Sequence, residues 1–194
     1  MNRGSILRSA AYAAFFAFVL TTSFACGGGG DGATGVLTAT FTPDTSTPGA
    51  STVAMLPGST SATFFNVRIT VTDTDDVYGA AFDITYPSTL IAYQSADNST
   101  SFLRDGGLGT GQLFFKVDSS TAGRLIVSAT RTGALPGVDV SGTRDLIVLR
   151  FQARTGFNAQ PIRFDTGKPL EVRNSLAQPI AVTWSSGAAS ASTN

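Results

Sequence analysis

The chain lacks the side chains that most enzymes use for proton transfer and nucleophilic attack. It contains no histidine and a single cysteine, Cys26. Histidine is the most frequent general acid or base, and a nucleophile needs a neighbouring base or a lowered pKa to react. Pairs of carboxylates can hydrolyse glycosides, but most acidic residues here lie in segments rich in turn-forming residues. The sequence therefore favours a non-catalytic protein without a cofactor.

Asp73, Asp75 and Asp76 place three carboxylates within four residues. Calcium prefers oxygen-rich loops of this kind, but the spacing and the bidentate glutamate of an EF-hand loop are absent. Aspartate also favours turns, because its side chain bonds to nearby backbone. We therefore expect a solvated hairpin turn here rather than a metal site.

Exposed aromatic rings are the usual platform on which modules of β-sandwich shape stack sugars. Trp184, the only tryptophan, is in phase with Ile180 and Val182, so we expect it in the core. Tyr86 also falls on the inner side of its strand. The rings that remain as candidates for exposure are scattered along the sequence: Tyr78, Phe64 and Phe114. A polysaccharide is therefore an alternative ligand rather than the first expectation.

The first 25 residues have the layout of a secretory signal peptide. Residues 1–9 contain two arginines and no acid, and residues 10–20 form an unbroken apolar run. The run is shorter than the ~20 residues that a spanning helix needs. Residues 23–26, Ser-Phe-Ala-Cys, resemble the lipobox of bacterial lipoproteins, in which the cysteine receives a diacylglyceryl thioether and then an N-acyl chain. A secreted protein with a free thiol is the alternative.

Cleavage before Cys26 would make the lipid-bearing cysteine the first residue of the mature protein. Residues 26–35 are glycine-rich and predict a flexible tether. Stable attachment takes at least two acyl chains, so a triacylated cysteine would hold the protein to a bilayer without a spanning helix. Gly27 after the cysteine resembles the pattern of lipoproteins sent to an outer membrane. We expect a bacterial cell-envelope protein, lipid-anchored in the outer membrane or at the cell surface.

The composition of the mature chain suits one β-rich domain. Loss of Arg3 and Arg8 lowers the number of basic residues from 13 to 11, against 13 acidic residues, so the net charge is −2. This balance gives no reason to expect a nucleic-acid partner. Helix formers are scarce, since Glu171 is the only glutamate and the chain has two lysines. Valine, threonine and phenylalanine favour strands instead.

Short alternating runs separated by turn residues predict an all-β sandwich over residues 36–187. Residues 63–72 alternate most clearly and place Phe65, Val67, Ile69 and Val71 on one side. Residues 145–153 are apolar on both sides, which suggests a strand covered on both faces. Residues 188–194 are expected to form a polar tail. The pattern predicts two antiparallel sheets about 10 Å apart.

Several of these segments resemble, in order, a cohesin domain, one of the β-sandwich modules that bind dockerins in cellulosomes and related assemblies. The resemblance begins at NVRITVTDTDDVYGAAFDITYPSTLIAY, residues 66–93. It continues through four further segments: residues 124–133, 146–154, 161–165 and 180–191. It implies a nine-stranded antiparallel jelly-roll sandwich, related in shape to carbohydrate-binding modules, after a cleaved signal peptide.

The chain departs from the cohesin pattern where dockerin-binding cohesins carry an Asn and an Asp in the third strand. The resemblance places Gly79 and Ala81 at those positions. Neither residue has a side chain that forms hydrogen bonds. The Tyr-Asp-Pro turn of the family is one residue shorter here, at Tyr86-Pro87. A dockerin suited to the usual face is expected to bind this one poorly.

We expect the protein to present a flat sheet face to a protein partner. The residues expected to point outward on that face are Ala81, Asp83 and Thr85, together with whichever of residues 124–131 and of Leu146, Val148, Arg150 and Gln152 point the same way. The partner could be a dockerin-bearing protein, another envelope component or an identical chain. A polysaccharide-binding module and a purely structural envelope protein are the alternatives.

Overall fold

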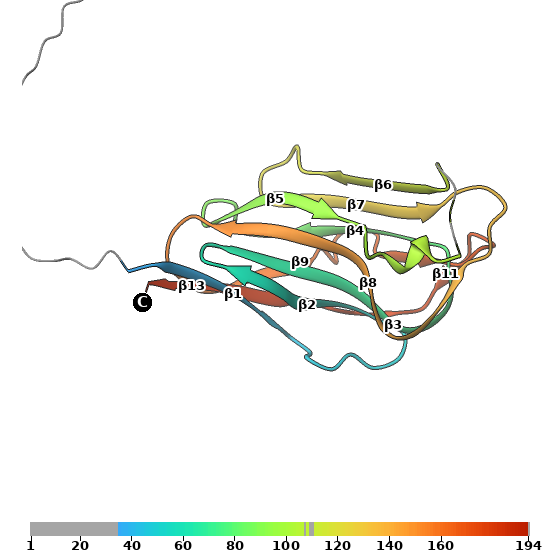
Figure 1. Cartoon of the computed structure of the whole chain (residues 1–194), viewed down its shortest axis with the longest axis horizontal. Coiled ribbons are helices and arrows are strands. Elements are labelled where there is room, and N and C mark those ends of the chain that lie inside the picture. Colours follow the sequence, from blue (N-terminus) through green and yellow to red (C-terminus); the bar gives the residue numbers. More distant parts are fainter. Residues whose placement is uncertain (1–34, 107, 109–110, 194) are drawn as a thin grey trace, which may run out of the picture. The chain divides into compact units, whose positions relative to one another are not determined.

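Two β-sheets pack against each other in the part of the chain that the computed structural model describes, residues 35–106, 108 and 111–193 (Figure 1). A short 3-10 helix, η1 (Phe102–Arg104), interrupts the strands, and its Phe102 and Leu103 are fully buried. The predicted all-β sandwich is confirmed. The predicted signal peptide, Cys26, Gly27 and residues 26–34 of the tether lie outside the described residues. Within the described part, no helix is long and apolar enough to cross a membrane.

The larger sheet has eight strands: β1 (Leu37–Pro43), β13 (Gly187–Thr193), β9 (Phe157–Phe164), β4 (Gly79–Thr85), β7 (Arg124–Arg131), β6 (Leu113–Asp118), β10 (Glu171–Arg173) and β11 (Pro179–Ile180). β7 pairs with one edge of β4 along its whole length, and β9 and β10 share the other edge. β4 therefore lies at the centre of this sheet, with β7 along one edge and β9 and β10 along the other.

The smaller sheet has five strands in the order β12 (Thr183–Ser185), β2 (Thr52–Ser61), β3 (Phe64–Val77), β8 (Val138–Ala153) and β5 (Ile91–Asp97). All pairs are antiparallel except β12 with β2. The described chain thus forms thirteen strands rather than the expected nine, because segments of two or three residues also pair.

The core is built from residues that alternate along β3 and β4. Phe65, Val67, Ile69 and Val71 are all fully buried, as their two-residue period predicts. From the opposing sheet, Phe82 meets Trp184 with ring centroids 5.7 Å apart. Large side chains that interdigitate in this way bring the dispersion and apolar burial that stabilise a sandwich.

A β-bulge in β8 accounts for the two consecutive buried residues of that strand, Leu146 and Ile147. Ile147 pairs with Ile69 while Asp145 pairs with Thr70, so Leu146 is the extra residue between them. Leu146 is fully buried. Its expected place on an exposed face is wrong, because the bulge changes the side to which the following residues point.

Residues 187–193 form a strand rather than part of a polar tail. β13 pairs with β1 from Leu37↔Thr193 to Pro43↔Gly187 and with β9 on its other side. Ala189 and Ala191 are buried. Small residues are needed here: a Cβ added at Gly187 would lie 2.3 Å from the Phe41 ring. The expectation of a tail over residues 188–194 is therefore wrong.

Candidate functional site

The structure separates the residues that were expected to form one exposed face. Ala81, Asp83 and Thr85 belong to β4 of the eight-stranded sheet, whereas Val148 and Arg150 belong to β8 of the five-stranded sheet. The outer faces of two packed sheets point in opposite directions. The expectation that Leu146, Val148 and Arg150 share a face with Ala81 is therefore wrong, whereas residues 124–131, the other candidates for that face, pair with β4 as β7. Each sheet must be considered by itself.

Asp83 is on the outer side of β4 but is not available to a partner. Arg124 on β7 forms an ion pair with its carboxylate, and only 9% of the Asp83 side chain is exposed. Thr85 is half-buried, and Ala81 is exposed. Ala81 is thus the residue of the predicted β4 set that a partner could reach most freely.

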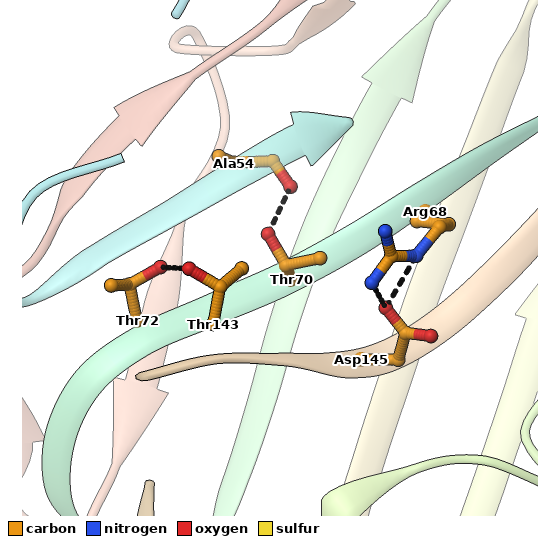
Figure 2. Close-up of polar contacts among 6 residues, drawn as sticks. All are labelled: Ala54, Arg68, Thr70, Thr72, Thr143 and Asp145. Atoms are coloured by element: carbon orange, nitrogen blue, oxygen red, sulfur yellow. Dashed lines mark hydrogen bonds and ion pairs between the residues drawn. The ribbon is translucent and has the colours of Figure 1, made fainter. Parts of the chain in front are cut away.

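The outer face of the five-stranded sheet is held together by its own polar contacts. Arg68 pairs with Asp145 at 2.7 Å, and the Thr72 and Thr143 hydroxyls are 2.9 Å apart (Figure 2). The Thr70 hydroxyl donates to the carbonyl of Ala54 at 3.2 Å, so it too has a partner within the sheet (Figure 2).

The two predicted residues on the outer face of this sheet, Val148 and Arg150, are also partly covered or in contact with a neighbour. Val148 is half-buried. Arg150 is exposed, and its guanidinium lies 4.4 Å from the centre of the Phe64 ring. Cation and ring are already in contact with each other, so neither is a free anchor for a partner.

The eight-stranded sheet carries a shallow hollow on its outer face, which we call the β4 hollow. It has a volume of about 320 Å³ and is lined by residues of β4, β7, β6 and β10 and of the adjoining loops. Register places two rows of side chains across it: Phe114, Thr130, Gly79 and Arg173 in one, and Lys116, Ser128, Ala81 and Glu171 in the next. The residues at the centre of the hollow, Gly79 and Ala81, are small, and residues at its edges such as Phe114 are large. A protruding side chain of a partner therefore fits between the edges.

Gly79 keeps the floor of the β4 hollow low. A Cβ at this position would lie 2.6 Å from Oγ1 and 2.7 Å from Cβ of Thr130, closer than van der Waals contact allows. The Thr130 hydroxyl donates to its neighbour's carbonyl at 3.0 Å, which fixes the side chain over the glycine. A larger residue at position 79 is therefore excluded unless β4 and β7 move apart.

Exposed apolar residues gather around this face. The described part of the chain has four large hydrophobic residues that are substantially exposed: Val36, Phe114, Ile126 and Leu176. Phe114 and Ile126 point outward from β6 and β7, and Leu176 lies in the turn between β10 and β11, next to Ala177 of the hollow. Exposed apolar residues in one region of a surface often mark an interaction site.

The charges at the rim of the β4 hollow largely compensate each other. Arg173 pairs with Glu171 at 2.8 Å and also donates to the carbonyl of Ala177 at 2.9 Å. Lys116 on the opposite side is exposed. The pKa of Asp118, at the far end of β6, is lowered by hydrogen bonds from the backbone and side chain of Ser120. The hollow is thus an apolar site with little net charge.

Tyr78 and Phe114, two of the scattered aromatic rings, meet at the β4 hollow. The Tyr78 hydroxyl donates to the carbonyl of Gly133 at 2.7 Å, which holds the side chain in place beside the hollow. Sequence reasoning missed this juxtaposition, because only the pairing of β4, β7 and β6 brings the two residues together. Trp184 packs against Phe164 with centroids 4.8 Å apart, on the core side as expected.

The acidic cluster does not form the expected hairpin turn. Asp73, Asp75 and Asp76 lie within β3, where Asp73 and Asp76 have positive φ values of 39° and 51°. The carboxylate of Asp73 accepts a hydrogen bond from the Gly142 backbone, and that of Asp76 accepts from Gly137 and Ser175. The carboxylates hold neighbouring segments in place. Across the described residues, no three such side chains converge as they would around a metal ion.

Comparison with known proteins places the fold. No family model matches the sequence, and no curated protein matches it. The solved structures that resemble the chain include the cohesin CaCohA2 from Clostridium acetobutylicum, with 16% identity over 78% of this chain and 88% of that one and a TM-score of 0.53. The sixth cohesin of scaffoldin B from Acetivibrio cellulolyticus, solved with a mutant Cel5 dockerin, shows 15% identity over 77% and 96% and a TM-score of 0.52.

A type II cohesin domain from the cellulosome of Acetivibrio cellulolyticus has 13% identity to this chain, covers 78% of it and 94% of its own length, and has a TM-score of 0.50. The sequence identities to these three solved structures are low, whereas most of each chain is covered. The similarity therefore shows a shared fold. The described residues therefore form a cohesin-like β-sandwich domain.

Proposed function

We propose that this protein is a non-catalytic binding module that captures a protein partner on the outer face of β6, β7, β4 and β10. The observation that carries the proposal is the β4 hollow, an apolar depression of the eight-stranded sheet with Phe114 at its rim, whereas the outer face of the five-stranded sheet is held by its own polar contacts. Cohesins of the same fold have been solved in complex with dockerins. We propose a dockerin-type domain or another envelope protein as the partner.

The chemistry of the hollow defines what that partner must offer. Gly79 and Ala81 stand where the cohesin pattern has polar residues, so a partner that places hydrogen-bonding groups there would leave them unpaired. Each such buried group costs about 1–3 kcal/mol. A protruding leucine, methionine or aromatic side chain would instead bury its apolar surface in the hollow, which stabilises a complex by about 25 cal/mol per Å². We expect a partner with an apolar anchor of this kind.

An anchored location would suit this arrangement. Leu37 pairs with Thr193 at one end of the eight-stranded sheet, whereas Gly79 lies at the other end, beyond the pairing of β9 with β4. We propose that Cys26 carries the lipid of an envelope lipoprotein. A bilayer reached through the chain before Leu37 would then leave the hollow free to meet its partner. Mass spectrometry of the N-terminal peptide of the mature protein tests this: an acylated Cys26 supports the proposal, and a free thiol contradicts it.

The binding proposal is tested with one variant and a matched control. In Ala81→Arg, a long side chain fills the hollow at an exposed position beside Glu171, so the fold is retained while the space for an apolar anchor is lost and its apolar surface would meet a charged group. Ser95→Arg adds the same side chain at an exposed position of β5, on the other sheet. Both variants and the unchanged full chain, extracted in detergent, are offered purified dockerins and an envelope extract.

The outcomes of this capture experiment distinguish the partners. A dockerin bound by the unchanged chain and by Ser95→Arg but not by Ala81→Arg identifies a cohesin-type activity. Another protein with the same behaviour identifies a different partner at the same face. Equal capture by Ala81→Arg, or loss of capture in both variants, contradicts the proposed face.

A further inference from the structure

A second pocket lies at the other end of β4, where the chain leaves the strand at Tyr86. It is formed by residues 86–93, the turn between β6 and β7, and the end of β8, and its volume is about 240 Å³. We call it the tyrosine pocket. Tyr86, Tyr93 and Arg154 line it together with the hydroxyls of Ser88 and Ser119, and Ile91 lies at its base.

The walls of the tyrosine pocket are joined by backbone hydrogen bonds. The Tyr86 amide donates to the carbonyl of Gly123 at 2.9 Å, and the Arg154 amide donates to the carbonyl of Leu90 at 2.8 Å. Gly123 has a φ of 80°, and a Cβ there would lie 2.9 Å from the Tyr86 carbonyl oxygen. The turn between β6 and β7 can approach this closely only with a glycine, so the pocket is preformed.

Both tyrosine rings are held in place from the core. Each packs edge-on against Phe151, with centroid distances of 5.5 Å for Tyr86 and 6.0 Å for Tyr93. Rings that are fixed before a ligand arrives lose little conformational freedom on binding. Burial, and then the proximity of Tyr86, raise the pKa of Tyr93.

The polar side chains of the tyrosine pocket have no hydrogen-bond or ion-pair partner within the described part of the chain. The side chains of Tyr86, Tyr93, Ser88, Ser119 and Arg154 form no hydrogen bond or ion pair there. Tyr78, in contrast, uses its hydroxyl within the fold. The side chains that line this preformed pocket thus bring four hydroxyls and a guanidinium that are available to a ligand.

The charge of the pocket favours an anion. Arg154 is the only ionisable group besides the two tyrosines among the lining residues, and none of the described residues that line it is acidic. Arginine binds carboxylates through two parallel, charge-assisted hydrogen bonds. A neutral ligand would leave this cation without a partner in the complex.

The hydroxyl groups and rings favour a sugar as the body of that ligand. Tyrosine and serine hydroxyls both donate and accept hydrogen bonds, as sugar hydroxyls do. A sugar ring also has an apolar C–H face that lies against an aromatic ring. We propose that the tyrosine pocket binds a carboxylated sugar, with the carboxylate at Arg154 and the ring against Tyr86 and Tyr93. This site is separate from the β4 hollow and does not depend on the function proposed for it.

A trimer of galacturonate tests the proposal, with its methyl ester as the neutral counterpart. Titration calorimetry on the full chain should detect binding of the acid and binding of the ester that is weaker by about tenfold or more. Arg154→Gln should lose about tenfold or more in affinity for the acid, because the charge-assisted pair is lost. Tyr93→Phe should lose a few-fold, because one hydroxyl is removed.

Arg150→Gln is the matched control, since it removes an exposed arginine of β8, the strand that ends just before Arg154, outside the pocket. It should bind the acid as the unchanged chain does, and so should Ala81→Arg, which alters only the β4 hollow. Equal binding of acid and ester, equal loss in Arg150→Gln and Arg154→Gln, or no binding of the acid would overturn the proposal. Displacement of the trimer by an equal concentration of inorganic phosphate would also overturn it, since a general anion site needs no sugar.

Discussion

Gly79 is the residue on which the shape of the β4 hollow depends most directly. A methyl group there would be pressed against Thr130 and against the carbonyl oxygen of Ala129, 2.9 Å away. Overpacking of this kind typically costs about 1–3 kcal/mol. We therefore predict that Gly79→Ala lowers the free energy of unfolding by that amount, measured by urea denaturation.

Gly49→Ala is the control for this substitution. Gly49 has no atom within 4 Å of an added Cβ, and its φ is not positive. Reduced freedom of the unfolded chain should leave Gly49→Ala neutral or more stable by about 0.4–1 kcal/mol. A loss of unfolding free energy in Gly79→Ala without a loss in Gly49→Ala supports the close approach of β4 and β7. Equal changes in unfolding free energy in the two variants contradict it.

Tyr93 gives the stability of the domain a dependence on alkaline pH. Because burial raises its pKa above the ordinary value of 10.0, the folded state keeps the proton at pH values where the unfolded state has lost it. The stabilisation is fully present below the unfolded pKa and is lost as the pH rises through the folded pKa. We predict that Tyr93→Phe reduces the fall in unfolding free energy above pH 10. Urea denaturation at pH 8 and at pH 11 measures it, and equal falls in both proteins would contradict the prediction.

At the scale of elements, the sequence predicts β3 and β4 well because their inner faces follow a strict two-residue period. Phe65, Val67 and Ile69 are buried as expected. Two elements could not be predicted in this way. The bulge in β8 breaks the period at Leu146, and β13 is made of alanine, serine and glycine, whose strand propensity is low.

The candidate site was harder to predict than the fold, because it depends on which strands share a sheet. Alternation correctly places Ala81 outward but says nothing about whether β8 lies beside β4 or across the core from it. It also cannot show that Arg124 covers Asp83 from the neighbouring strand. The β4 hollow and the tyrosine pocket both arise from such pairings between distant segments.

Leu146 tests the bulge. Since the structure buries this side chain completely, Leu146→Ala should lower the unfolding free energy by about 2–5 kcal/mol, the usual cost of such a cavity. Val148→Ala, two residues along the same strand and half-buried, should cost less. Thermal or chemical unfolding compares the two variants. A smaller effect at Leu146 than at Val148 would place Leu146 back on the surface.

The role of β13 is tested by truncation. Removal of residues 187–194 takes away a strand that pairs on both sides and exposes the edges of β1 and β9. We predict that this chain fails to fold cooperatively, as followed by near-ultraviolet circular dichroism during heating. Removal of Asn194 alone should leave the transition unchanged. A normal transition after the longer truncation would show that the last residues are dispensable.

At the scale of the whole domain, the outer faces of the two sheets differ in how their side chains are used. The five-stranded sheet uses its outward polar residues to bind one another, as Arg68 and Asp145 do. The eight-stranded sheet leaves small and apolar residues open on β4, β6 and β7. The β4 hollow and the tyrosine pocket lie at opposite ends of β4. One rigid sandwich can therefore offer a protein-binding face and a separate small-molecule pocket.

The most direct measurement is hydrogen exchange of the full chain with and without the partner that it captures. If the β4 hollow is the binding face, amide protection should increase at residues 79–81, 113–117 and 126–130, and residues 66–70 and 144–150 of the other sheet should exchange unchanged. Protection confined to the five-stranded sheet would contradict the account, because the partner would then bind the face that the protein holds by its own polar contacts.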